Sequence, residues 1–153
     1  MGAMTKKWLY WIVTVGGVGT LPKAPGTWGT LAAIPIWYLF TRGSPNLYLV
    51  LTIATIFFAV FASHRYELEN ESHDSQEIVI DEVAGFLVTM TWLPVNMYYL
   101  GAGFILFRLL DALKPWPISY LDKNIKGGYG VVMDDIAAGL IANIALQALM
   151  HFA

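Results

Sequence analysis

The acidic side chains of this chain are confined to a few short segments, and long apolar stretches separate them. No aspartate or glutamate precedes Glu67, and five of the eleven acids fall within 64–77. The apolar stretches are long and show no alternation of period two, so they favour helices over strands. We expect helices at 27–41, 46–63, 78–93, 96–113 and 132–152. The expected fold class is therefore all-α, a small helical bundle, with the acidic segment 64–77 as a solvated connector.

Length and composition limit the class of protein. A chain of 153 residues suits one domain, so residues 1–153 are assigned to a single helical domain, with residues 1–4 interpreted as a tag remnant. Nine Lys and Arg against eleven Asp and Glu give no basic excess, which argues against nucleic acid as a partner. The chain has no cysteine, which excludes disulfides and thiolate metal sites. The oligomeric state stays open.

The apolar content favours a membrane protein over a soluble helical bundle. Hydrophobic residues make up 57% of the chain and charged residues 13%, whereas soluble domains average about 45–50% and about 25%. The stretches 47–63 and 136–152 reach the lower limit of about 17 residues for a transmembrane helix. Local thinning of the bilayer can accommodate shorter helices. We expect four to five membrane-embedded helices.

The basic residues predict which end of the bundle faces the cytoplasm. With the Gly/Pro-rich segment 16–30 inside and the helices threaded alternately, the outer side receives Arg42 as its one basic residue. The same threading places all the acids at the inner side. We therefore expect a multi-pass membrane protein whose polar end is cytoplasmic. The basic residues on the inner side are Lys6, Lys7, Lys23, Arg65, Lys114, Lys123 and Lys126.

Three clusters of charged residues stand at predicted helix ends. In an antiparallel bundle these ends meet at one surface, which gathers five carboxylates and two cations. Gly85 and Gly139, about one turn from the acids, let helix backbones approach closely. Clustered carboxylates repel one another unless a cation lies between them, and Mg²⁺ prefers oxygen ligands, so a Mg²⁺ site is expected. The clusters are Asp81 and Glu82; Arg108, Asp111 and Lys114; Asp134 and Asp135.

The Gly/Pro-rich segment 16–30 is a further candidate for binding an anion. Glycine lets backbone N–H groups turn toward an anion, and a helix N-terminus adds partial positive charge. Thr20, Thr27 and Thr30 can donate hydrogen bonds, and Lys23 adds charge. The segment lacks the spacing of a Walker A loop. It is interpreted either as a phosphate cradle or as an ordinary turn.

The order of four segments resembles the phosphatidylglycerophosphatase A family. The resemblance covers about residues 15–142 and rests on PKAPGTWGT, IDEVAGF, FRLLDALKPWPI and GGYGVVMDDIAAG. It implies a Mg²⁺-dependent phosphatase of the bacterial inner membrane, which hydrolyses the terminal phosphate of phosphatidylglycerophosphate to give phosphatidylglycerol. The family's motif positions correspond to Thr20, Pro25, Gly26, Thr27, Asp81, Glu82, Arg108, Asp111, Lys114, Pro115, Asp134 and Asp135.

The residues and the resemblance together lead to a hypothesis for the metal site. We expect one or two Mg²⁺ to be held by Asp81, Glu82, Asp134 and Asp135. The role of Asp111 stays open among orienting Arg108, binding metal, and acting as base or nucleophile.

The same hypothesis assigns residues to the substrate phosphate. Arg108 is expected to bind it in bidentate fashion and Lys114 as a point charge. The resemblance adds Thr20, Gly26 and Thr27 to the phosphate-binding set. The substrate and partner is then a phospholipid in the membrane, with its headgroup phosphate at the cytoplasmic interface.

Other functions fit the same residues. Carboxylates inside a membrane can relay cations, so a small ion or proton transporter is one alternative, although the acids gather at one surface. A structural membrane subunit is another. A soluble-type relative acting on a different phosphomonoester is a third.

Overall fold

The computed structural model describes residues 3–72 and 75–152, and within these ranges the chain is helical with no strand. The all-α prediction is confirmed. Residues 1 and 2 of the segment interpreted as a tag remnant lie outside the described residues. The helices are α1 (Ala3–Val13), the short 3₁₀ turn η1 (Val18–Thr20), α2 (Pro25–Phe40), α3 (Pro45–Asn70), α4 (Ile80–Thr89), α5 (Met97–Leu113), α6 (Ile118–Asn124) and α7 (Gly127–Phe152).

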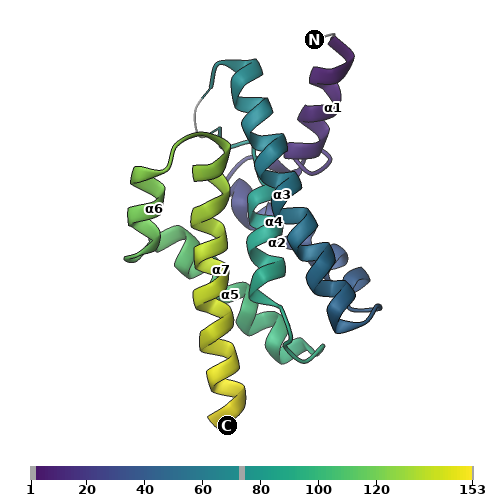
Figure 1. Cartoon of the computed structure of the whole chain (residues 1–153), viewed down its shortest axis with the longest axis vertical. Helices are drawn as coiled ribbons and strands as arrows, with labels where there is room; N and C mark the ends of the chain where they lie inside the picture. The colour runs from purple at the N-terminus through teal and green to yellow at the C-terminus, as the bar shows by residue number, and fades with distance from the viewer. Residues whose placement is uncertain (1–2, 73–74, 153) are drawn as a thin grey trace.

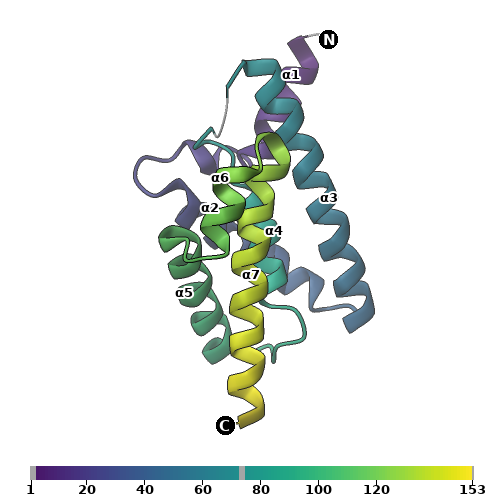
Figure 2. The ribbon, with the colours of Figure 1, turned by 60° about the vertical axis from the view of Figure 1, so that its left-hand side comes forward.

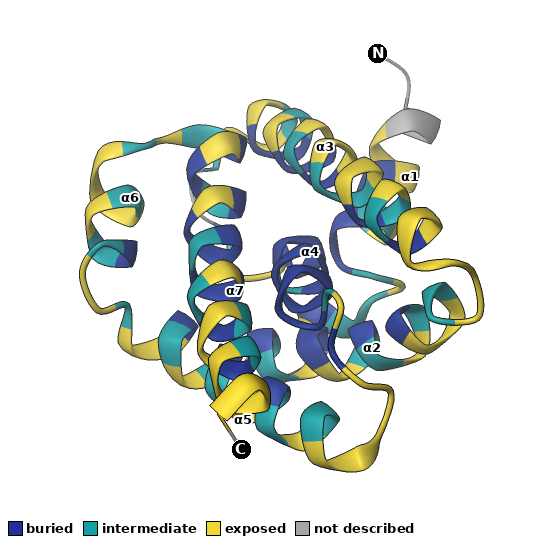
Figure 3. Ribbon diagram, turned by 60° about the horizontal axis from the view of Figure 1, so that its bottom comes forward, coloured by how far each residue is buried: buried dark blue, intermediate teal, exposed yellow. Residues whose placement is uncertain are grey.

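The shortest of the central helices, α4, forms the middle of the bundle. Nine of its ten residues are buried, and α2, α3, α5 and α7 pack around it (Figure 3). Phe86 and Leu87 of α4 are fully buried together with Phe107 of α5. Since Asp81 and Glu82 stand in the first turn of α4, the packing that builds the core also fixes these two carboxylates.

Five helices, α2, α3, α4, α5 and α7, run in alternating directions, as the threading of the sequence predicts. The end of α3 and the start of α7 lie toward one end of the molecule, and the C-terminus lies at the other (Figures 1 and 2). The starts of α2, α4 and α7 and the end of α5 therefore come together. The α2–α3 and α4–α5 connections meet at the opposite end.

Two described helices, α3 and α7, are long and apolar enough to cross a membrane. Only 28% of the apolar stretch of α3 and 44% of that of α7 is buried inside the protein, so side chains such as Phe57, Phe61 and Ile144 face outward. With 17 residues, α5 just reaches the lower limit of about 17 for a transmembrane helix, and α2, with 16 residues, falls short of it. The ten residues of α4 extend only about 15 Å, half of a hydrocarbon core of about 30 Å.

Helix boundaries differ from the sequence prediction mainly at the polar end. α3 continues to Asn70 instead of ending at residue 63, because Tyr66 and Glu67 are buried there. The interpretation of 64–77 as a solvated connector is therefore wrong for its first half. α7 starts at Gly127, five residues before its predicted start, and α1 and α6 are additional helices.

The C-terminal end of α4 lies inside the bundle, where its free carbonyl groups need hydrogen-bond donors. Long helices supply them. Tyr48 of α3 donates its hydroxyl to the Leu87 carbonyl at 2.7 Å. Asn143 of α7 donates to the carbonyls of Thr89 and Thr91, both at 2.8 Å. A helix too short to cross the bilayer thus ends without leaving these backbone groups unpaired.

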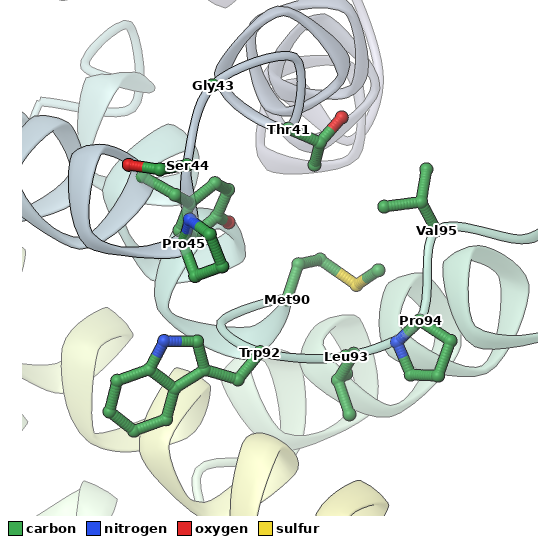
Figure 4. Close-up of a pocket in the computed structure, with 10 residues that line it drawn as sticks. Thr41, Gly43, Ser44, Pro45, Met90, Trp92, Leu93, Pro94 and Val95 are labelled. Atoms are coloured by element: carbon green, nitrogen blue, oxygen red, sulfur yellow. The ribbon is translucent and has the colours of Figure 1, made fainter.

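A cavity of about 400 Å³ lies between the α2–α3 and α4–α5 connections (Figure 4). Pro45, Met90, Trp92 and Pro94 contribute to its largely apolar wall. None of its lining residues is charged. The charged residues that the sequence analysis singles out lie at the other end of the bundle.

Candidate active site

The three charged clusters predicted from the sequence come together in one cavity. The cavity has a volume of about 420 Å³ and lies where α2, α4 and α7 begin and α5 ends. All seven residues of the three clusters are part of its wall. The lining residues are Ala24, Pro25, Gly26, Ser75, Gln76, Ile78, Asp81, Glu82, Arg108, Asp111, Lys114, Val131, Asp134 and Asp135.

Two overlapping groups of three carboxylates could each hold a metal ion. The first comprises Asp81, Glu82 and Asp135, and the second comprises Asp111, Asp134 and Asp135. Within each group the candidate ligand oxygens lie within 4.8 Å of one another. Asp135 belongs to both groups. An ion in either group, or one in each, would therefore use Asp135.

The hydrogen bonding of these carboxylates fits a bound cation. One oxygen each of Asp81, Glu82 and Asp135 is buried and has no hydrogen-bond partner within the described part of the chain. Buried anionic oxygens without partners carry a large desolvation cost. A hard divalent cation such as Mg²⁺ takes oxygen ligands of this type and would remove that cost. The residues present therefore fit the ion that the sequence predicts.

Two glycines allow the carboxylates of α4 and α7 to meet. A Cβ atom on Gly85 of α4 would lie 2.8 Å from the Asp135 carbonyl oxygen, and one on Gly139 of α7 would lie 2.4 Å from the Gly85 carbonyl oxygen. Any side chain at these positions would push the two backbones apart. The close approach that the sequence predicts at this pair is confirmed.

Burial changes the acidity of the α4 carboxyls. It raises the pKa of Asp81 well above the ordinary value, and the neighbouring charge of Glu82 raises it further. Burial also raises the pKa of Glu82, although the nearby Arg108 guanidinium opposes this change. In the absence of a metal ion, these two carboxyls retain protons at pH values where exposed carboxyls are ionised.

Both cations predicted for the site form ion pairs with its acids. Arg108 pairs with Asp111 one turn along α5. The Lys114 ammonium lies 2.6 Å from an Asp134 oxygen and 2.6 Å from an Asp122 oxygen. Burial alone would lower the pKa of Lys114, but the hydrogen bonds to Asp122 and Asp134 outweigh burial and raise it.

The Gly/Pro-rich segment contributes Gly26 to the cavity, together with Ala24 and Pro25. A Cβ atom on Gly26 would lie 2.4 Å from a Glu82 oxygen and 3.0 Å from the Arg108 guanidinium nitrogens. Thr20 and Thr27 are not among the described residues that line the cavity. Thr20 is exposed and donates its hydroxyl to the Gly17 carbonyl at 2.7 Å.

Sequence reasoning missed three polar residues at the site. Ser75 and Gln76 line the cavity from the segment that precedes α4, within the region expected to be a solvated connector. Asp122 reaches Lys114 from α6, a helix that was not predicted. The sequence signal for Asp122 was its position between the two motifs that carry Lys114 and Asp134, eight residues beyond Lys114.

The fold and the cavity define a class of protein, a helical bundle with a candidate divalent-cation centre beside two cations suited to phosphate. Comparison with known sequences gives the family. The chain belongs to the phosphatidylglycerophosphatase A family, whose sequence model matches residues 11–150. This match confirms the resemblance found in the motifs.

Individual relatives agree with the family assignment. The chain is 42% identical over 142 residues to phosphatidylglycerophosphatase A of Escherichia coli K12, covering 92% of this chain and 83% of that protein. It is 31% identical to the protein of the same name in Haemophilus influenzae, covering 92% and 88%. A Bacteroides thetaiotaomicron protein, provisionally named a phosphatidylinositol-3-phosphatase, is 34% identical, covering 85% and 86%. No solved structure matches the chain.

Proposed function

We propose that this protein is a Mg²⁺-dependent phosphatase that hydrolyses phosphatidylglycerophosphate to phosphatidylglycerol and inorganic phosphate. The family assignment and the names of two relatives support the reaction. One observation carries the proposal. Two groups of three carboxylates share Asp135 and lie in one cavity with Arg108 and Lys114. Phosphoryl transfer needs positive charge around the phosphate, and this cavity offers two cations and oxygen ligands for a third.

The metal ligands are Asp81, Glu82, Asp134 and Asp135. Mg²⁺ held by these residues would stabilise negative charge on the phosphate oxygens and would lower the pKa of an attacking water. The protein holds the ligands in place through the close contact of α4 with α7. Asp134 also accepts a hydrogen bond from the Asp135 backbone N–H at 3.0 Å, which fixes one of its oxygens.

Arg108 and Lys114 bind the phosphate. Asp111 orients the Arg108 guanidinium through their ion pair and also belongs to the second carboxylate group. Arg108 can then present its remaining N–H groups to two phosphate oxygens. Gly26 leaves the space beside Arg108 open, because any side chain there would meet the guanidinium and Glu82.

The roles of Thr20 and Thr27 differ from that of Gly26 in this proposal. Neither threonine is among the described residues that line the cavity, so each acts in phosphate binding only through the segment 16–30, whose last residues form the first turns of α2 and include Gly26. Thr20 does so by its hydrogen bond to the Gly17 carbonyl in the turn before α2.

We place the protein in the bacterial inner membrane as a multi-pass protein, with the cavity at the cytoplasmic face. Outward-facing apolar side chains on α3 and α7 support contact with lipid. The bias of basic residues toward the cavity end supports its cytoplasmic orientation. A headgroup phosphate at the interface would then reach the cavity while the acyl chains stay in the bilayer.

Phosphate release by the purified protein tests this proposal. We expect release from phosphatidylglycerophosphate with Mg²⁺ and none with a chelator. Asp135→Asn and Arg108→Ala should each abolish it, whereas Glu71→Gln, a matched carboxylate-to-amide change outside the cavity, should not. Near-normal release by Asp135→Asn or Arg108→Ala would refute the assigned roles.

A panel of substrates separates this activity from the alternative that the Bacteroides relative suggests. Phosphatidylinositol 3-phosphate and soluble glycerol 3-phosphate should be poorer substrates than phosphatidylglycerophosphate. Preference for either compound would mean that the same metal-assisted hydrolysis acts on a different phosphomonoester. Cation flux into liposomes without phosphate release would favour a transporter instead.

A further inference from the structure

Asp122 is a charged residue outside the cavity that contacts a residue within it. Its carboxylate lies 2.6 Å from the Lys114 ammonium, and it is not among the described residues that line the cavity. The same ammonium lies 2.6 Å from Asp134. Lys114 therefore stands between one acid inside the cavity and one acid outside it.

The backbone places Lys114 so that both acids can reach it. Lys114 follows the last residue of α5 and adopts a left-handed conformation, with φ 44°. α6 starts four residues later and is anchored by Ile118, which is fully buried. α6 packs against α7, the helix that carries Asp134. The backbone position of Asp122 is therefore fixed by the packing of α6, through Ile118, and does not depend on the ion pair with Lys114.

With a single acidic partner, the Lys114 ammonium would be poorly oriented toward a bound phosphate. The ammonium is a compact charge on a flexible stem of four carbons, so its direction depends on its partners. With Asp134 as the only acid nearby, Lys114 would compete with the metal ion for that carboxylate. Asp122 gives the ammonium a second acidic partner at the same distance of 2.6 Å, so Asp134 is not its only counter-charge.

We propose that Asp122 is a positioning residue for the phosphatase reaction, which acts by holding the Lys114 ammonium toward the substrate phosphate. This inference rests on the proposed function. Asp122 does not touch the substrate or the metal ion, and its effect passes entirely through Lys114.

A double-mutant cycle with steady-state kinetics on phosphatidylglycerophosphate tests the inference. Asp122→Ala should raise KM by about threefold to fivefold, the size expected when a partly exposed ion pair is lost, while kcat changes much less. Asp122→Glu should recover most of the loss. In a Lys114→Ala background, Asp122→Ala should have no further effect, because coupled residues are not additive.

Controls separate positioning from a loss of structure. Lys123→Ala changes the neighbouring exposed residue of α6 and should leave KM unchanged. Asp122→Asn preserves the shape of the side chain and should reproduce the KM effect without lowering the thermal unfolding midpoint. An unchanged KM in both Asp122→Ala and Asp122→Asn, or effects of Asp122→Ala and Lys114→Ala that multiply in the double variant, would overturn the inference.

The proposed function and this inference fail in different ways. If Asp135→Asn and Lys114→Ala retain normal phosphate release, the proposed site itself is wrong. If Asp135→Asn is inactive and Lys114→Ala keeps only reduced, measurable release, while the Asp122 variants match the unmodified protein, only the role of Asp122 is wrong.

Discussion

A Cβ atom on Gly139 would lie 2.4 Å from the carbonyl oxygen of Gly85, so the backbones of α7 and α4 are in contact at these two residues. Asp135 stands one turn before Gly139, and Asp81 and Glu82 stand one turn before Gly85. The contact therefore sets the distance between the carboxylates of the two helices. The distance between the proposed metal ligands depends on a position without any side chain.

Gly139→Ala should separate α4 from α7. Overpacking of this kind costs about 1–3 kcal/mol of stability, and the shift also moves Asp135 away from Asp81. We expect a lower thermal unfolding midpoint and a higher Mg²⁺ concentration for half-maximal phosphate release. Gly101→Ala is the matched control, because a Cβ there meets no atom within 4 Å. Equal behaviour of the two variants would contradict the proposed role of the contact.

Gly26→Ala should impair catalysis more than stability. The new Cβ would meet the ends of two flexible side chains, Glu82 and Arg108, which can move away at little cost to folding. Their movement would disturb Glu82 as a proposed metal ligand and Arg108 as the proposed phosphate-binding cation. We expect kcat/KM to fall by about tenfold or more, equivalent to about 1.4 kcal/mol in the transition state. An unchanged kcat/KM would show that the substrate phosphate does not bind beside Gly26.

Asn143→Leu should destabilise the protein by removing two hydrogen bonds at the end of α4. The buried Thr89 carbonyl would lose its side-chain partner, and a buried group left unpaired costs about 1–3 kcal/mol, whereas the Thr91 carbonyl would keep its bond from Gln147. Gln147→Leu removes one longer bond of 3.2 Å to the Thr91 carbonyl and should cost less. Equilibrium unfolding in detergent measures both. The reverse order would contradict the assignment of Asn143 as the main partner.

The metal-free protein should lose stability as the pH rises. Burial raises the pKa of Asp81 and Glu82, so the folded protein retains protons that the unfolded chain releases from about pH 4 upward. Their stabilising contribution is complete below that range and disappears as the pH rises through the raised pKa values.

Mg²⁺ should reverse this loss, because the ion replaces the protons at the same oxygens. The stabilisation by Mg²⁺ is therefore expected to grow with pH, reaching about 2.7 kcal/mol at a concentration of 100 times the Kd. Unfolding midpoints with Mg²⁺ and with a chelator, measured across the pH range, test both statements. Asp81→Asn with Glu82→Gln should flatten both dependences. A chelated protein that becomes steadily more stable as the pH rises would contradict the expected sign.

Helix positions could be predicted from the sequence because apolar runs and helix-starting residues are local signals. The start of α5 shows this, since Asn96 accepts the N–H of Tyr99 as a helix cap and the prediction was off by one residue. The predicted helix boundaries were wrong where a residue is buried by contacts with segments distant in the chain. α3 continues through an acidic segment because Tyr66 and Glu67 pack inside the protein, and nothing in the local pattern indicates this.

The sequence by itself determined the types of charged residue, their spacing and the helix ends that carry them, because side-chain chemistry and helical period are properties of short segments. Only the tertiary structure decided which side chains are partners. That Lys114 lies between Asp122 and Asp134, and that Ser75 and Gln76 reach the cavity, depends on how α6, α7 and the segment before α4 pack. Such contacts are set by the approach of backbones distant in the chain, which no local pattern encodes.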